Sequence, residues 1–130
     1  MLAPAAAPKV RVGMLGSGHS HFYGKYKAMA DSPDYEIAGV VENNAALKAA
    51  LLKDSRYTGI KFLDEAAMLH DPSIQLVVVE CRVWEALPWG KKVIAAGKHL
   101  HLEKPCGNEW KPFKELVEEA RRKKIGRAHV

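Results

Sequence analysis

The chain has 130 residues, of which 48% are hydrophobic and 27% are charged, and its formal net charge is +5. This length fits one domain around one core, and the ordinary composition excludes disordered, collagen-like and coiled-coil proteins. The whole positive excess lies in residues 121–127, which hold five Lys and Arg residues and no acid. We therefore predict a solvated helix end there, and no nucleic-acid partner.

The first eight residues are rich in Ala and Pro, and we predict that they form a flexible leader outside the folded domain. They lack the basic region and apolar stretch of a signal peptide, and no apolar run is long enough to span a membrane. Cys81 and Cys106 are too few and too far apart for a disulfide framework. These features predict a soluble cytoplasmic protein with no membrane partner.

Apolar strand patterns and helical patterns alternate along residues 9–124. The predicted strands are 10–15, 35–41, 60–63, 76–79 and 99–102. The predicted helices are 20–31, 44–53, 64–70, 85–96 and 109–124. With connections this short, the alternation predicts a doubly wound α/β domain of the Rossmann type, with about five parallel strands and helices on both faces.

A glycine-rich turn joins the first strand to the first helix and reads Gly16-Ser17-Gly18-His19-Ser20-His21. Gly16 permits a tight turn, and Gly18 lets the backbone approach a pyrophosphate at the helix N-terminus. We predict that all six residues contact a dinucleotide cofactor. His21 stands where a third small residue is usual, so a plain strand-to-helix turn stays open as the alternative.

A carboxylate, Glu42, directly follows the second predicted strand and lies 24 residues after Gly18. In this position it can accept hydrogen bonds from the adenosine ribose, and it would repel a 2′-phosphate. No Lys or Arg adjoins it in the sequence. Glu42 therefore favours NAD over NADP as the cofactor, with an exposed loop acid as the alternative interpretation.

The last predicted strand follows Gly97-Lys98 and ends in Glu103-Lys104-Pro105. This segment closely resembles the Gfo/Idh/MocA oxidoreductases, a family named for glucose–fructose oxidoreductase and inositol dehydrogenase, and the resemblance extends over nearly all of residues 9–124. It implies the NAD(P)-binding domain of an enzyme that transfers hydride between a nicotinamide cofactor and a sugar, polyol or related carbonyl compound. By this match Lys104 is the catalytic lysine, whose ammonium can stabilise negative charge on the substrate oxygen, and Glu103 borders the nicotinamide.

After the fourth strand the family has Thr-Pro and a turn that contacts the cofactor, whereas this chain has Cys81-Arg82-Val83-Trp84. The match assigns Cys81 and Arg82 to the cofactor site. Trp84 either covers a nicotinamide or adenine ring or packs at the start of the next helix.

Two pairs of histidines, His19 with His21 and His99 with His101, raise the question of a metal site. The first pair follows the end of a strand and the second pair begins one, so they lie at opposite edges of a parallel sheet. No carboxylate or thiolate has the spacing of a zinc site. The sequence therefore predicts no metal.

Members of the family carry a second domain, which supplies the substrate pocket. Residues 125–130 resemble no part of the family, and we predict that they form a tail. This tail would result from a truncated reading frame, from the isolation of one domain or from a vector. We expect cofactor binding without turnover and substrate binding only with the second domain. We also expect self-association, either through an open sheet edge at residues 99–102 or through surface that the second domain would cover. As an alternative, the chain is a non-catalytic remnant that binds a dinucleotide or a partner. A third interpretation is a methyltransferase with a Rossmann fold, which the Glu-Lys-Pro segment disfavours.

Overall fold

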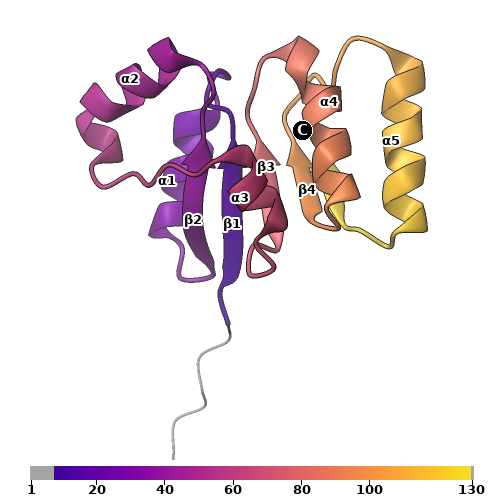
Figure 1. Ribbon diagram of the computed structural model, residues 1–130, viewed down its shortest axis with the longest axis horizontal. Helices are drawn as coiled ribbons and strands as arrows, with labels where there is room; N and C mark the ends of the chain where they lie inside the picture. The colour runs from indigo at the N-terminus through magenta and orange to yellow at the C-terminus, as the bar shows by residue number, and fades with distance from the viewer. Residues whose placement is uncertain (1–7, 130) are drawn as a thin grey trace, which may run out of the picture.

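The computed structural model describes residues 8–129 of the chain. It contains one parallel sheet with the strand order β2-β1-β3-β4-β5 (Figure 1). The strands are β1 (Val10–Leu15), β2 (Tyr35–Val41), β3 (Leu76–Val79), β4 (His99–Leu102) and β5 (Arg127–His129). The helices are α1 (Phe22–Asp31), α2 (Ala45–Lys53), α3 (Glu65–His70), α4 (Val83–Ala95) and α5 (Trp110–Arg122), with a 3-10 turn at Ser55–Tyr57. The predicted doubly wound α/β fold is confirmed.

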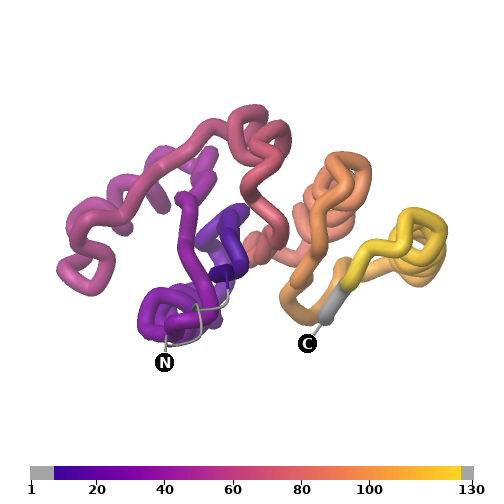
Figure 2. The backbone as a smooth tube through the Cα atoms, turned by 90° about the horizontal axis from the view of Figure 1, so that it is seen from below, coloured from indigo at the N-terminus to yellow at the C-terminus, as the bar shows by residue number. Residues whose placement is uncertain are grey.

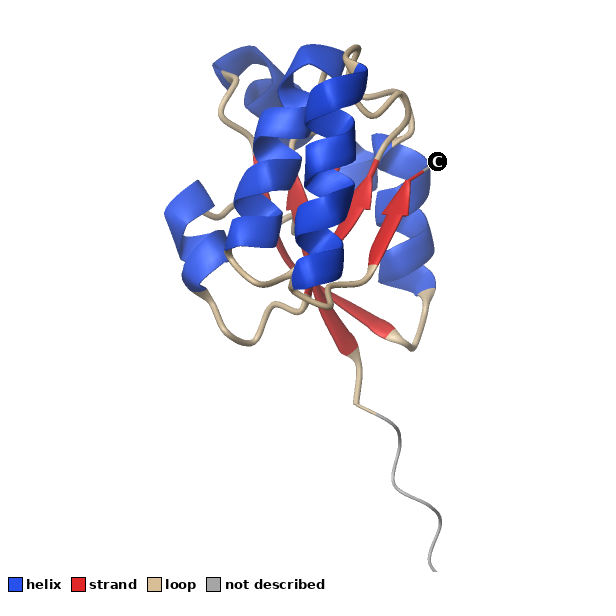
Figure 3. Ribbon diagram, turned by 90° about the vertical axis from the view of Figure 1, so that its right-hand side faces the viewer, coloured by secondary structure: helices blue, strands red, loops and turns tan. Residues whose placement is uncertain are grey.

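Helices cover both faces of the sheet (Figures 2 and 3). Each face has its own core of buried side chains. On the α1 face, Phe22 and Met29 belong to one cluster with Val12 and Met14 of β1. On the opposite face, side chains of α3, α4 and α5 form the second cluster with the other side chains of the strands. Met68 of α3 belongs to this cluster and is fully buried. Successive strand residues point to opposite faces, so an apolar run such as Leu76–Val79 serves both cores.

Two short signals define where the helices next to the site begin and end. Asn44 accepts a hydrogen bond from the Leu47 N–H at 3.0 Å and so caps α2, as expected for an Asn at this position. Gly97 follows α4 with a φ of +76°, a conformation that favours glycine and lets the chain turn back into β4.

Two predictions about the strands are wrong. Residues 60–63 do not form a strand, because their pairing with the sheet is limited to a single bridge between Val40 and Phe62. Instead, β5 supplies the fifth strand from within the predicted tail, and it pairs in parallel with β4 from Leu100↔Arg127 to Leu102↔His129. The edge of β4 is therefore covered, and the expected self-association through this edge has no basis in the structure.

The order of the strands creates a switch point beside β1. The chain passes from β1 to β2 on one side and then returns to β3 on the other. Ligands of open α/β sheets bind in the crevice beyond the carboxyl ends of the strands at such a point. Among the described residues, no helix combines the length and apolar character that crossing a membrane requires.

Candidate functional site

Most of the predicted site residues lie at the carboxyl edge of the sheet. The glycine loop follows β1, Glu42 follows β2, Cys81 and Arg82 stand just beyond β3, and Glu103 and Lys104 follow β4. Segments that are far apart in the sequence thus meet at one edge, because all the strands run in the same direction. The switch point lies at the centre of this group.

The glycine loop makes a tight turn against the segment after β3. Gly16 has a φ of +82°, and a Cβ atom there would lie 3.0 Å from the Cβ of Cys81. The His19 N–H donates to the carbonyl of Glu80 at 3.0 Å, which ties the loop to the end of β3. The loop leads into α1, a helix long enough to present a positive N-terminal dipole. This is the backbone arrangement that a diphosphate group requires.

Glu42 is fixed in place by three hydrogen bonds. Its Oε1 accepts from the Ser17 N–H at 2.8 Å and from the Ser17 hydroxyl at 2.5 Å, and its Oε2 accepts from the Asn44 N–H at 3.0 Å. Two acceptor positions on Oε1 are therefore in use, whereas Oε2 keeps one for a further donor. The carboxylate is thus held ready at the tip of β2.

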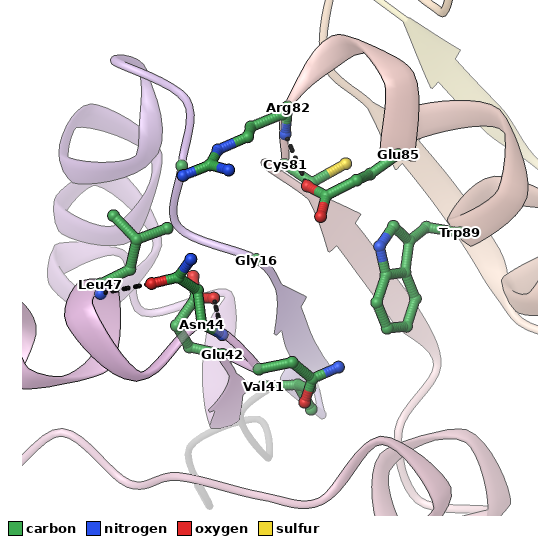
Figure 4. A pocket seen from close by; sticks show the side chains of 11 residues that line it. Gly16, Val41, Glu42, Asn44, Leu47, Cys81, Arg82, Glu85 and Trp89 are labelled. Atoms are coloured by element: carbon green, nitrogen blue, oxygen red, sulfur yellow. Dashed lines mark hydrogen bonds between the residues drawn. The ribbon is translucent and has the colours of Figure 1, made fainter.

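A pocket connects the glycine loop with Glu42 and the start of α4 (Figure 4). Its lining consists of Gly16, Gly18, Val41, Glu42, Asn43, Asn44, Leu47, Cys81, Arg82, Glu85 and Trp89. Four of the predicted cofactor residues besides Glu42 are among them. Because Cys81 is buried, its pKa is raised to about 12, so it lines the pocket as a neutral thiol and not as a nucleophile.

A buried group of charges lies beside this pocket, below the ends of β3 and β4. The ammonium of Lys25, on α1, contacts Glu80 Oε1 at 2.5 Å and also donates to Glu103 Oε2. Glu80 is fully buried and Glu103 is 3% exposed. The other oxygen of Glu103, Oε1, accepts from the Lys104 N–H at 2.9 Å. Lys25 therefore bridges two buried carboxylates with a single positive charge and anchors the segment that carries Lys104.

The two carboxylates respond differently to this environment. Burial raises the pKa of Glu80, because desolvation disfavours its charged form. Burial also acts to raise the pKa of Glu103, but hydrogen bonds from Lys25 and from the Lys104 N–H outweigh it and lower that pKa to about 2. Glu103 is therefore the more strongly ionised member of the pair.

Acid should weaken the fold through Glu103. Because its pKa is lower in the folded than in the unfolded chain, its contribution is present above pH 4.5 and is lost as the pH falls towards 2. We expect this contribution to be about 3 kcal/mol. The raised pKa of Glu80 changes the pH dependence of stability in the opposite direction. Glu80 is present in both the wild type and the variant Glu103→Gln, so its effect is common to the two. Urea unfolding across this pH range should show a shallower loss for Glu103→Gln than for the wild type, and parallel curves would contradict the assignment.

His19, His21 and Glu103 come close enough together to resemble a metal-binding group, with one ligand atom of each within 4.8 Å of the others. The sequence offered no carboxylate for such a group, because Glu103 reaches it only through the fold. However, the Glu103 oxygen that lies 3.2 Å from His21 Nδ1 is also the one that Lys25 contacts. An ammonium thus already provides the positive charge at this carboxylate.

The structure separates some predicted residues from the pocket and adds others. Trp84 is 67% exposed in the first turn of α4 and faces a groove between α4 and α5, so it does not line the pocket. Trp89, one and a half turns further along α4, lines the pocket instead. Lys104 is exposed at the end of β4, next to a cis peptide bond with Pro105. Ser20 and His21 lie at the start of α1, outside the pocket lining.

Sequence reasoning missed the contribution of Lys25 and Glu80. Glu80 did carry a signal, because it is a single acid that directly ends the buried run of β3. Lys25 carried none, since one lysine on a helix normally faces solvent. Only the packing of α1 against the sheet brings the two together.

Comparison with known proteins agrees with this geometry. The model of the oxidoreductase family with an NAD-binding Rossmann fold (Gfo/Idh/MocA) matches residues 10–127. An uncharacterized oxidoreductase of Schizosaccharomyces pombe is 28% identical over 119 residues, which are 91% of this chain and 32% of that protein.

Solved structures show the same fold. A chain from Yersinia pestis, whose oxidoreductase assignment is itself provisional, is 28% identical with a TM-score of 0.79, over 98% of this chain and 35% of that one. Biliverdin reductase from Synechocystis sp. PCC 6803, solved with biliverdin and NADP+, is 23% identical with a TM-score of 0.79, over 92% of this chain and 37% of that one. The chain thus spans about a third of the length of these relatives.

Proposed function

Because the chain belongs to the oxidoreductase family with an NAD-binding Rossmann fold, we propose that it binds NAD(H) in the crevice at the carboxyl edge of its sheet. The observation that carries this proposal is the fixed carboxylate of Glu42 beside a tight glycine loop at the N-terminus of α1. These are the groups that recognise a ribose and a diphosphate, respectively.

The strand order supports one orientation of the bound cofactor. Its adenosine would lie at Glu42, beyond β2, and its diphosphate over Gly16 and Gly18, beyond β1. The nicotinamide would then extend towards the ends of β3 and β4, where Glu103 and Lys104 stand. This direction brings the residues of the Glu-Lys-Pro segment to the reactive end of the cofactor.

Lys104 would act on the substrate at this end. A bound nicotinamide supplies the hydride chemistry, and the chain supplies charge and position. The Lys104 ammonium can donate a hydrogen bond to an alcohol or carbonyl oxygen and stabilise the negative charge that develops there. Its backbone is held by Glu103, which Lys25 holds in turn. The proposed substrate is a sugar, polyol or related carbonyl compound.

We expect the chain alone to bind the cofactor without turnover. It spans about a third of its relatives, and hydride transfer needs a substrate held against the nicotinamide with a proton acceptor nearby. Steady formation of NADH from a polyol by the purified chain would contradict this expectation.

A cytoplasmic setting also belongs to the proposal. Cys81 and Cys106 are both free thiols in the structure, which fits a reducing compartment.

The cofactor preference should depend on Glu42. Glu42→Ala removes the acceptor for the ribose hydroxyls and the repulsion towards a 2′-phosphate, so we expect NADH affinity to fall about tenfold and NADPH affinity to fall less or to rise. Fluorescence titration with NADH and NADPH measures both. Glu36→Ala is the matched control, because Glu36 is an exposed acid at the opposite end of β2, paired with Arg11. Equal losses for the two cofactors would show that Glu42 does not read the ribose.

A further inference from the structure

The side chain of Arg82 lies across the glycine loop. A Cβ atom at Gly18 would lie 3.4 Å from Arg82 Cγ and 3.6 Å from Leu47 Cδ1, so these two side chains flank the glycine. Figure 4 shows Arg82 extending from the start of α4 over the pocket towards Leu47 of α2. The guanidinium group therefore stands at the mouth of the pocket, beside the backbone that a diphosphate would approach.

This guanidinium has no carboxylate partner among the described residues. Both acids that line the pocket are engaged elsewhere, since Glu42 accepts from Ser17 and Asn44, and Glu85 accepts from the Arg82 backbone N–H at 3.1 Å. The Arg82 guanidinium instead lies over the ring of Trp84, with its Cζ atom 5.6 Å from the ring centroid. A permanent positive charge thus stands at the mouth of the pocket with no ion pair to break when an anionic ligand arrives.

We propose that Arg82 binds the bridging diphosphate of the dinucleotide, closing over it from the α4 side while the N-terminus of α1 holds it from below. This inference rests on the proposed function. A guanidinium presents parallel N–H groups that match two phosphate oxygens, and such charge-assisted hydrogen bonds are strong. Because Arg82 is exposed, its guanidinium can rotate to make room for the ligand.

The location favours the diphosphate over a 2′-phosphate. The Arg82 side chain packs on Gly18, whereas a 2′-phosphate would lie beside the Glu42 carboxylate at the tip of β2. Arg82 makes no ion pair with Glu42. A diphosphate and a 2′-phosphate present the same chemistry to a guanidinium. The experiment therefore compares NADH, which carries only the diphosphate, with NADPH, which carries both groups, and adenosine, which carries neither.

The test uses the whole chain and isothermal titration calorimetry with NADH, NADPH and adenosine. For Arg82→Met we expect NADH affinity to fall about tenfold. Adenosine, which has no phosphate, should bind as it does to the wild type. NADH binding to the wild type should weaken with added salt more steeply than binding to the variant. Arg82→Lys keeps the charge but loses the paired N–H groups, so its NADH affinity should lie between those of the wild type and Arg82→Met.

Lys91→Met is the matched control, because it removes one exposed positive charge from the same helix outside the pocket, and it should bind NADH like the wild type. Unchanged NADH affinity in Arg82→Met would overturn the inference. So would an equal loss for adenosine, which would place the guanidinium on the adenine ring, or a loss confined to NADPH, which would place it on the 2′-phosphate. Failure of the wild type to bind NADH at all would instead refute the proposed function, and the inference with it.

Discussion

Lys25→Met is expected to lower the free energy of unfolding by about 3–5 kcal/mol, because it leaves two buried carboxylates without their shared partner. Such a loss is a large part of the stability of a small domain. Neither carboxylate can reach water without moving, since Glu80 is fully buried and Glu103 nearly so. Urea unfolding at neutral pH measures the change directly.

Two further variants separate the buried charges from a general effect on α1. Lys25→Met combined with Glu80→Gln removes one of the two stranded charges and should recover part of the lost stability. Lys27→Met removes a neighbouring lysine of the same helix, whose ion pair with Asp31 is exposed, and should change little. If the two single lysine variants unfold alike, the buried charge group does not stabilise the fold as described.

Gly16→Ala is expected to lower NADH affinity by on the order of tenfold or more, with a loss of stability. A side chain at a φ of +82° is strained, and its Cβ would lie 3.0 Å from the Cβ and 3.2 Å from the Cα of Cys81. The backbone of Cys81 cannot move away without disturbing the end of β3. The loop must therefore shift, and the diphosphate would lose the backbone that it approaches.

Gly24→Ala is the matched control for this variant. Gly24 lies in α1, and a Cβ atom there would meet nothing within 4 Å. Alanine is the better helix former, so stability should rise by about 0.5–1 kcal/mol with NADH binding unchanged. Titration with NADH measures the affinity of both variants, and thermal unfolding measures their stability. Equal NADH affinities for the two would mean that the glycine loop does not bind the cofactor.

Sequence patterns predicted the framework of the site because its parts are local. The glycine loop, Glu42 and the Glu103-Lys104 pair each follow a strand directly, and parallel strands bring their carboxyl ends to one edge. The same reasoning could not find the ion pair between Lys25 and Glu80. These residues come from a helix and a strand far apart in the chain, and only packing joins them.

Proximity in space also adds a group to the pocket that holds Glu42. The sequence has no Lys or Arg beside Glu42, yet the fold brings Arg82 to the same pocket from the start of α4.

The fifth strand also depends on contacts that the local sequence does not reveal. Residues 60–63 look like a strand locally, but only Phe62 bridges the sheet, whereas the polar segment β5 pairs along β4. Strand formation here depends on an available edge more than on apolar character.

The most direct test of the central claim, that NADH binds at the carboxyl edge, is an NMR titration of the ¹⁵N-labelled chain with NADH. We predict saturable shifts of the amides of Gly16, Gly18 and Glu42, followed by those of Glu103 and Lys104, with little change in the groove between α4 and α5. Absence of saturable shifts, or shifts that gather in that groove, would contradict the account.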